Sequence, residues 1–252
     1  MATEHCQKFL LFIALIAFAI LGSTITLAAD APHPVPLPIG QIVARMAAMD
    51  AQRTAKKQSY RGLRHYTVDY KGFPHDKHAE MVVQVTVNPP RKELTIVSET
   101  GSKFLLNRVL RKIVDSERET DSGRNHRDVS LTEENYNFQL VGTEPVQGRL
   151  CYVLQVDPKH GNKFLYRGKV WIDAEDFALT QISAKPAKNP SFWISSVNIE
   201  HHYQKHGDLW LPSSSESTSK VRLGGKAMLT IDYKNYDFPE NAVADTMSRQ
   251  NP

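Results

Sequence analysis

The sequence predicts an α+β fold in which a strongly curved antiparallel sheet, an incomplete β-barrel or half-barrel, is covered by two or three helices. Turn-forming residues recur at intervals of about 12 to 20 residues after position 140, and the segments between them alternate apolar with polar side chains, as consecutive β-hairpins do. Two stretches carry apolar residues at clear helical spacing. Because a long antiparallel sheet with one apolar face needs a cover, we expect these helices to lie on it and to enclose an apolar cavity.

The strands are expected in two groups. In the first group, residues 63–70 alternate weakly, residues 81–87 alternate cleanly, and a third strand follows at 93–98. The second group is the long meander. Its alternation and turn signals predict strands at 136–142, 149–157, 163–173, 177–184, 192–205, 209–222 and 226–238.

The first helix is expected from residue 39 to about residue 57, because apolar side chains recur there at helical spacing. Its apolar positions are Ile39, Ile42, Val43, Met46 and Met49. The second helix is expected after Ser102, which is a suitable N-cap. Its apolar stripe contains Leu106, Val109, Leu110 and Ile113, and its opposite side carries Lys103, Arg108, Arg111 and Lys112.

The segment that follows the second helix, residues 115–128, is highly charged and contains a glycine, which predicts a mobile loop. Ser130 and Glu133 then have the spacing of a capping box, so a short helical turn is expected before the meander begins.

Residues 1–29 have the features of a signal peptide for export to the periplasm. Lys8 precedes a continuous apolar run at 9–21, and small residues follow it. An uncleaved inner-membrane anchor stays open as the alternative, because residues 9–29 are long enough to span a bilayer. The remaining expected parts are a proline-rich linker at 30–40, a single domain at 41–240 and a flexible tail at 241–252.

The composition indicates an ordinary globular domain, with 41% hydrophobic and 23% charged residues. The net charge of +4 is small and the cations are scattered, which argues against a nucleic-acid partner. Cys6 falls in the predicted signal peptide, so Cys151 has no intramolecular partner in the processed chain and is expected to be a buried apolar residue. We expect a monomer without disulfides.

No pattern in the sequence supplies a catalytic, cofactor or metal site. In a regular strand His201 points away from His202 and His206, so the three histidines cannot converge on one metal ion without a bulge. The serine-rich stretch 213–219 lacks a nucleophile elbow, and we interpret it as the polar face of an edge strand, where Pro212 is tolerated. We therefore expect a binding protein without cofactor or metal, and not an enzyme.

Apolar and aromatic residues are the candidates for a ligand cavity, with plain core packing open as the alternative for each. Burial of an acyl chain of about 15 methylenes yields roughly 12 kcal/mol before ordering costs, so a lipid-binding cavity needs no charged motif. The candidates are Met46, Met49, Met81, Val83, Val85, Leu106, Leu110, Phe138, Tyr166 and Trp193.

Three motifs of the meander resemble a known family. They are FLYRGKVWIDAEDFAL at 164–179, PSFW at 190–193 and LWLP at 209–212. Together they resemble bacterial outer-membrane lipoprotein-sorting proteins of the LolA-like superfamily, which also includes the half-barrel of a periplasmic sigma-factor regulator. The resemblance extends from the first helix to Tyr236. It implies an incomplete β-barrel with a helical lid over a cavity that accepts acyl chains.

The resemblance also implies a function, namely periplasmic binding and transport of lipoproteins or lipids, as a chaperone does. The implied lid mechanism uses an arginine, and Arg61 and Arg64, early in the first strand, are the candidates. A regulatory or sensor module is the alternative. In that case the half-barrel binds an acylated ligand and contacts an inner- or outer-membrane protein partner through the basic side of the second helix.

Overall fold

The computed structural model describes residues 37–56, 58–120, 130–161, 165–188, 194–222 and 224–239. These residues belong to one compact unit, which is described here by itself. The predicted signal peptide, most of the predicted linker at 30–40 and the predicted tail at 241–252 lie outside the described residues, and so does the cavity candidate Trp193.

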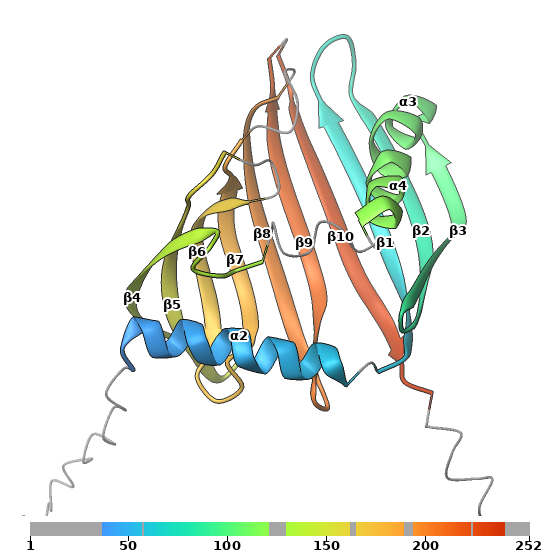
Figure 1. Cartoon of the computed structure of the whole chain (residues 1–252). Helices are drawn as coiled ribbons and strands as arrows, with labels where there is room; N and C mark the ends of the chain where they lie inside the picture. Colours follow the sequence, from blue (N-terminus) through green and yellow to red (C-terminus); the bar gives the residue numbers. More distant parts are fainter. Residues whose placement is uncertain are drawn as a thin grey trace, which may run out of the picture. The chain divides into compact units, whose positions relative to one another are not determined.

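The strands of the described residues form one antiparallel sheet in the order β3-β2-β1-β10-β9-β8-β7-β6-β5-β4 (Figure 1). The first three strands join the meander because β1 pairs with β10, the last strand of the chain. The sheet stays open, with β3 and β4 at its edges. The strands are β1 (Tyr60–Lys71), β2 (Lys77–Asn88), β3 (Arg91–Gly101), β4 (Tyr136–Val146), β5 (Arg149–Pro158), β6 (Tyr166–Asp173), β7 (Leu179–Pro186), β8 (Ile194–His206), β9 (Leu209–Val221) and β10 (Lys226–Asp237).

The ten predicted strands are all present. In the described residues β6, β8, β9 and β10 are shorter than the alternation indicated, and β1–β5 are longer. The five strands are longer because ladder hydrogen bonds continue past the last clearly alternating residue into the hairpin turns. The β4–β5 hairpin is an example: its two turn residues, Gln147 and Gly148, have φ values of 51° and 77°. Positive φ at both positions is the geometry of the two-residue turn that matches the twist of paired strands.

In the described part of the chain, two helical segments cover the sheet (Figure 1). The first is α2 (Ile39–Ala55), as predicted. The second is continuous and consists of α3 (Lys103–Leu105), the π-helical turn η1 (Leu106–Leu110) and α4 (Arg111–Thr120). Both pack on the same side of the sheet, which we call the inner face; the opposite side is the outer face. An open antiparallel sheet with helices on one face agrees with the predicted α+β class.

The structure corrects one prediction about the segment between the second helix and β4. Residues 115–120 are helical and not part of a loop, because Glu117 is held by cations from two strands. Residues 121–129 lie outside the described residues. The short helical turn expected before the meander is present, because the backbone N–H groups of Asn135 and Tyr136 donate to the Thr132 carbonyl oxygen, at 3.1 and 3.0 Å. Ser102 does precede the second helix at the N-cap position, but its side chain makes no capping hydrogen bond. No helix in the described part of the chain has the length and apolar character needed to cross a bilayer.

Candidate functional site on the inner face

One row of directly paired residues crosses the inner face and shows how it is built. In strand order from β2 to β4, its members are Met81, Tyr66, Ile231, Ser215, His201, Ile182, Val170, Leu154 and Leu140. Directly opposed residues of an antiparallel pair share a face of the sheet. The row is apolar or aromatic at both ends and polar at Ser215 and His201. The inner face therefore has two apolar regions with a polar centre between them.

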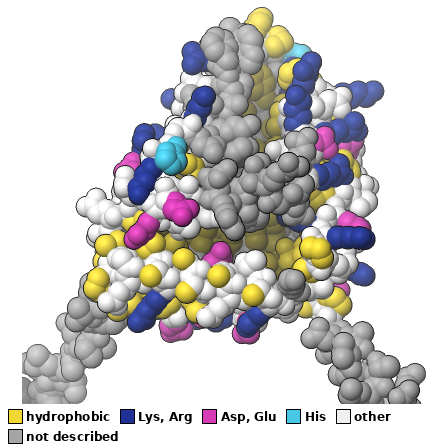
Figure 2. All heavy atoms as spheres, in the orientation of Figure 1, with side chains coloured by type: hydrophobic (Ala, Val, Ile, Leu, Met, Phe, Trp, Pro, Cys, Tyr) yellow, Lys and Arg dark blue, Asp and Glu magenta, His cyan; other side chains and the backbone are white. Residues whose placement is uncertain are grey.

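The α2 cluster is the apolar contact between α2 and strands β4–β7. Ile42, Val43 and Met46 recur at helical spacing, point at the sheet and are at most 5% exposed. In Figure 2 further hydrophobic side chains are visible between α2 and the part of the sheet above it. The buried residues that complete the α2 cluster are Tyr136, Tyr152, Leu154, Val156, Leu165, Val170, Ile172, Phe177, Ile182 and Ala184.

The α4 cluster is the apolar contact between the second helical segment and strands β1–β3 and β10. Its helical members are Leu105, Leu106, Leu110 and Val114, and the last two are fully buried. Leu106 and Leu110 are the first and last residues of the π-helical turn, so this turn lies directly on the sheet. The strands contribute Tyr66, Val68, Ala79, Met81, Val83, Val85, Leu94 and Ile231.

A serine stripe, Ser215, Ser217 and Ser219, separates the two clusters on β9. These serines occupy alternate positions, and they pair with His201, Ile199 and Val197 of β8, so they face inward. The prediction of an edge strand is wrong, since β9 lies between β8 and β10. Pro212 is tolerated inside the sheet because the β8–β9 register shifts there, at a bulge between His202 and Tyr203.

Uncharged aromatic side chains line the polar centre beside the serine stripe. Burial raises the pKa of Tyr233 to about 12 and also raises the pKa values of Tyr166 and Tyr203. The ring of His201 packs edge-on against Tyr166, with 6.3 Å between ring centroids. Burial, and secondarily repulsion from His202, lowers the pKa of His201 to about 4. The centre is therefore rich in hydroxyl groups and carries no charge on these side chains at neutral pH.

Arg64 and Glu117 form a partly buried ion pair that fastens α4 to the sheet, in addition to the more exposed pair of Arg111 with Glu99. An Arg64 guanidinium nitrogen lies 2.5 Å from Glu117 Oε2, and Lys92 of β3 donates to Glu117 Oε1. Burial alone would raise the pKa of Glu117, but the hydrogen bond and attraction of Arg64, reinforced by Lys92, lower it. Of the two lid candidates, Arg64 therefore contacts the second helical segment, whereas Arg61 is exposed.

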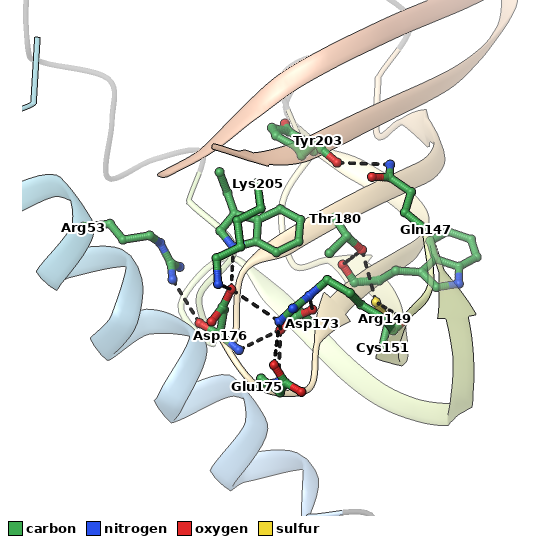
Figure 3. Close-up of polar contacts among 12 residues, drawn as sticks. Arg53, Gln147, Arg149, Cys151, Asp173, Glu175, Asp176, Thr180, Tyr203 and Lys205 are labelled. Carbon is green, nitrogen blue, oxygen red and sulfur yellow. Dashed lines mark hydrogen bonds and ion pairs between the residues drawn. The ribbon is translucent and has the colours of Figure 1, made fainter. Parts of the chain in front are cut away.

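The C-terminal part of α2 is fastened mainly to backbone atoms, as Figure 3 shows. Arg53 donates to the carbonyl oxygens of Asp176, at 3.0 Å, and Phe177, at 3.4 Å, both in the β6–β7 connection. Lys56 forms an exposed ion pair with Asp208 in the β8–β9 turn, at 2.8 Å.

Asp173 builds the β6–β7 turn to which α2 is fastened (Figure 3). Its carboxylate accepts the backbone N–H groups of Glu175 and Asp176 and a bidentate pair of bonds from Arg149, at 2.5 and 2.8 Å. Burial would raise the pKa of Asp173, and these partners lower it. The Asp of the VWID motif thus has a structural role in this turn.

Cys151 is fully buried on the outer side of β5 with Val153 and Trp171, which confirms the expectation of a buried apolar residue. Burial raises the pKa of its thiol. His201 lies in the polar centre, whereas the ring of His206 packs at a tilt against the rings of Tyr236 and Phe238. Within the described residues, no three His, Cys, Asp or Glu side chains are grouped to hold a metal ion.

The predicted cavity residues divide between the two clusters and do not form one group. Met46 belongs to the α2 cluster, and Met49, Phe138 and Tyr166 pack against it while partly buried. The others, Met81, Val83, Val85, Leu106 and Leu110, are buried in the α4 cluster. Their role as cavity residues stays a prediction.

Sequence reasoning missed three parts of the site: the serine stripe as an inward face, His201 as a partly buried neutral group, and Glu117 as an ion-pair partner. The alternation of Ser215, Ser217 and Ser219 was a visible signal for one common face. No local signal marks Glu117 or His201, because their partners lie on distant strands.

Comparisons with known proteins give a family match and several solved structures. Residues 132–236 match a family described as a family of unknown function, DUF5686. No curated protein matches the chain.

The chain is similar to LolA superfamily proteins, lipoprotein-sorting domains and MucB, at low identity. A putative outer membrane lipoprotein-sorting protein domain from Vibrio parahaemolyticus is 13% identical, with coverage of 77% of this chain and 92% of that chain and a TM-score of 0.35. A LolA superfamily protein from Nitrosomonas europaea is 9% identical, with coverage of 83% and 97% and a TM-score of 0.33. MucB in the MucA/MucB complex from Pseudomonas aeruginosa is 12% identical, with coverage of 77% and 92% and a TM-score of 0.29. At these values the similarities say nothing about activity.

Proposed function

We propose that this protein binds acyl chains of lipoproteins or lipids non-covalently on the inner face of its sheet and carries them through the periplasm. The observation that supports this proposal is the row from Met81 to Leu140, in which two apolar regions flank a polar centre. Each apolar region lies under its own helical segment, so either region becomes available when its helix moves.

In the proposed binding step an acyl chain replaces a helix on the apolar side chains of the sheet. Displacing α2 or α4 uncovers apolar side chains that an acyl chain then covers again. The gross gain for such a chain is about 0.8 kcal/mol per methylene, which offsets the loss of helix packing. The sheet itself stays intact, because its ladder hydrogen bonds involve neither helix. In this proposal the two segments serve as the lid of a half-barrel.

The polar centre suits the part of a lipid where acyl chains meet the headgroup. Ester and amide carbonyls at that junction accept hydrogen bonds, and the hydroxyl groups of Ser215, Ser217 and Tyr233 donate them. Arg64, beside Tyr233 with 5.1 Å between its guanidinium carbon and the ring centroid, lies at the border of the centre and the α4 cluster. We assign it the role of the lid arginine.

The periplasmic location is part of the proposal and rests on the predicted signal peptide at 1–29 and the sequence resemblance. The same resemblance, together with the absence of a catalytic motif in the sequence, leads us to propose a binding protein and not an enzyme.

Native mass spectrometry tests the proposal directly. The chain is expressed with its own N-terminus and purified from the periplasmic fraction. Its mass is measured under non-denaturing conditions, and any bound ligand is extracted and identified. A stoichiometric acylated species is the expected result. A protein that is empty and also fails to bind an added fluorescent long-chain fatty acid contradicts the proposal.

A matched pair of variants connects binding to the inner face. Met49→Asp puts a charge on the partly buried rim of the α2 cluster, whereas Met228→Asp makes the same change on the outer face, where Met228 is 37% exposed. Met49→Asp should weaken fatty-acid binding at least tenfold, and Met228→Asp should leave it unchanged. Val83→Asp should abolish binding in the α4 cluster. Retained binding by a folded Val83→Asp or Met49→Asp protein would argue against the inner face as the site.

A regulatory module is the second candidate, and one observation favours it. Phe104, at the start of the second helical segment, is 59% exposed beside the exposed cations Lys103 and Arg108. An exposed aromatic residue among cations suits an acidic segment of a protein partner. Co-purification of a membrane protein with the wild-type chain but not with Phe104→Ser would support this candidate over a freely diffusing carrier.

A further inference from the structure

The end of the sheet opposite α2 carries two loops that are joined to each other. We call this end the tip and define it as the described residues of 71–77 and 220–226. The Tyr70 hydroxyl lies 2.8 Å from the carbonyl oxygen of Phe73 and 3.0 Å from that of Gly224, so it links the β1–β2 loop to the β9–β10 turn. Gly225, at φ 131°, approaches β1 so closely that a Cβ there would lie 2.8 Å from the Lys71 carbonyl oxygen. The tip is therefore one surface built from two distant segments.

The tip places three lysines side by side. In the register of the sheet, Lys71 is directly opposite Lys226, and Lys226 is directly opposite Lys220. Like charges in directly opposed positions destabilise a sheet. Lys71 has an exposed partner in Asp76, at 3.3 Å, but the tip as a whole holds five Lys or Arg against this single acid. Such a row suggests that a negatively charged partner offsets the repulsion.

A recess of about 730 Å³ opens on the outer face beside the lysine row. Its polar lining residues are Ser195, Asn198, Thr218, Lys220, Arg222 and Lys226. Hydroxyl, amide and cationic groups can all donate hydrogen bonds, and phosphate oxygens accept them. The carboxylate of Asp69, nearby on β1, is engaged by His78 at 2.8 Å.

An exposed aromatic residue stands next to these cations. Phe73, in the β1–β2 loop, is 81% exposed, which is the largest exposed fraction among the large apolar residues described as exposed. Figure 2 shows hydrophobic side chains at the top end of the molecule with Lys and Arg side chains on both flanks. An aromatic ring at the level of lipid headgroups, with lysines beside it, is typical of a surface that binds at the membrane interface.

We propose that the tip docks on an anionic phospholipid bilayer, with Phe73 in the headgroup layer and lipid phosphates at the Lys71–Lys226–Lys220 row and in the adjoining recess. Charge complementarity selects this partner: the row is cationic, the recess offers phosphate donors, and the protruding residue is aromatic and not charged. The docking surface is separate from the inner face, so this inference does not depend on the proposed acyl binding.

Vesicle flotation tests the docking surface. The test uses residues 30–252, because the apolar run at 9–21 would itself enter a bilayer. This shortened chain should fold, since it retains the whole compact unit from Pro36 to Pro252. Vesicles of equal parts phosphatidylcholine and phosphatidylglycerol should bind it, and vesicles of phosphatidylcholine alone should not. Binding should fall steeply as salt is raised to about 0.5 M, because exposed charges are then screened.

Two variants identify the residues that bind. Lys220→Gln/Lys226→Gln should weaken vesicle binding about fivefold per lysine, roughly twenty-five-fold in all. Because it removes a repulsive pair, this variant should unfold at the same temperature as wild type or higher. Phe73→Ser should weaken binding about tenfold without affecting stability, since the side chain is exposed.

The matched control is Lys169→Gln/Lys234→Gln, which removes the same charge from exposed positions outside the tip. It should change binding by less than about twofold. Equal losses in the two lysine pairs would overturn the proposal, because general charge would then explain the effect. Binding to neutral vesicles, or binding of inorganic phosphate without any vesicle binding, would overturn it as well.

Discussion

The two apolar regions of the inner face are built alike but fastened differently. Each is a helical segment packed on four strands, with helical residues that are fully buried. In the α2 region Arg53 donates to backbone carbonyl oxygens, and the ion pair of Lys56 with Asp208 is exposed. In the α4 region Arg118 likewise donates to a backbone carbonyl oxygen, that of Leu94, at 2.7 Å. The difference is Glu117, a partly buried carboxylate of α4 that is shared by two cations.

This difference determines what can loosen each region. Carbonyl groups do not titrate and barely respond to salt, so the contacts of Arg53 persist across the pH range. A carboxylate can be protonated, and its removal leaves Arg64 partly buried without its counter-charge. The α4 region should therefore respond to acid and to charge substitutions, whereas the α2 region should respond mainly to changes in packing.

Core truncations should have the largest effects and test whether the two regions unfold together. Ile42→Ala in α2 and Leu110→Ala in the second segment each remove a fully buried side chain, and each should lower the free energy of unfolding by about 2–5 kcal/mol. Urea denaturation followed by tryptophan fluorescence reports mainly on the meander, where Trp171 and Trp210 lie. Because β10 and β9 pair without a break in register, both variants should shift the same transition. A Leu110→Ala protein with an unchanged fluorescence transition would show two independent regions.

Removal of a charged group should destabilise the α4 region more than the α2 region. Glu117→Gln should lower the free energy of unfolding by about 2–3 kcal/mol, because Arg64 loses its partner in a site that is only partly hydrated. Arg53→Met should cost only about 1 kcal/mol, the net value of its hydrogen bonds. Hydrogen exchange should locate the loss in α4 for the first variant and in α2 for the second. The double variant Arg64→Gln/Glu117→Gln should recover part of the loss; equal effects of Glu117→Gln in wild-type and Arg64→Gln backgrounds would exclude the pair as the cause.

The pH dependence should expose the polar centre between the regions. The pKa of His201 is about 4 in the folded protein and about 6.5 in an unfolded chain, so the unfolded state takes up the proton first as pH falls. Stability is therefore full above about pH 6.5, and about 2 kcal/mol should be lost by pH 5 through this group. The lowered pKa of Glu117 acts in a lower window, below its unfolded value of about 4.3. Urea denaturation at pH 6.5 and at pH 5 measures the free energy of unfolding, which should fall less with pH in His201→Gln than in wild type. An equal fall in the two proteins would contradict the lowered pKa of His201.

The smallest effect is expected at the exposed end of α2. Lys56→Gln removes an ion pair whose side chains are 54% and 75% exposed, so the free energy of unfolding should change by less than about 0.5 kcal/mol. The midpoint of urea denaturation at low and at moderate salt measures this. A loss above 1 kcal/mol would mean that charge, and not packing, fastens α2 as well.

The sequence could predict the elements with strong local periodicity. The clean alternation at 81–87 and in the meander gave β2 and β4–β10, and the spacing of Ile42, Val43 and Met46 gave α2. Each of these patterns arises because one face of the element is buried.

What the sequence could not predict are contacts between distant segments. Residues 115–120 look like a loop because they are charged, yet Glu117 is stabilised in α4 by Arg64 and Lys92, which local composition does not reveal. The serine run reads as an edge strand for the same reason: serines are polar, and only the pairing of β9 with β10 and β8 turns Ser215 inward.

The pairing of β1 with β10 has a consequence for how the chain is made. Tyr70 and Gly224 touch across 154 positions of sequence, so the first hairpin can finish its sheet only after nearly the whole domain has been synthesised. Until then the free backbone groups of β1 form an open edge that can pair with other chains. Contacts of such high sequence separation slow folding, so the interval is long. The protein should therefore depend, more than most of its size, on whatever keeps a newly made chain from aggregating.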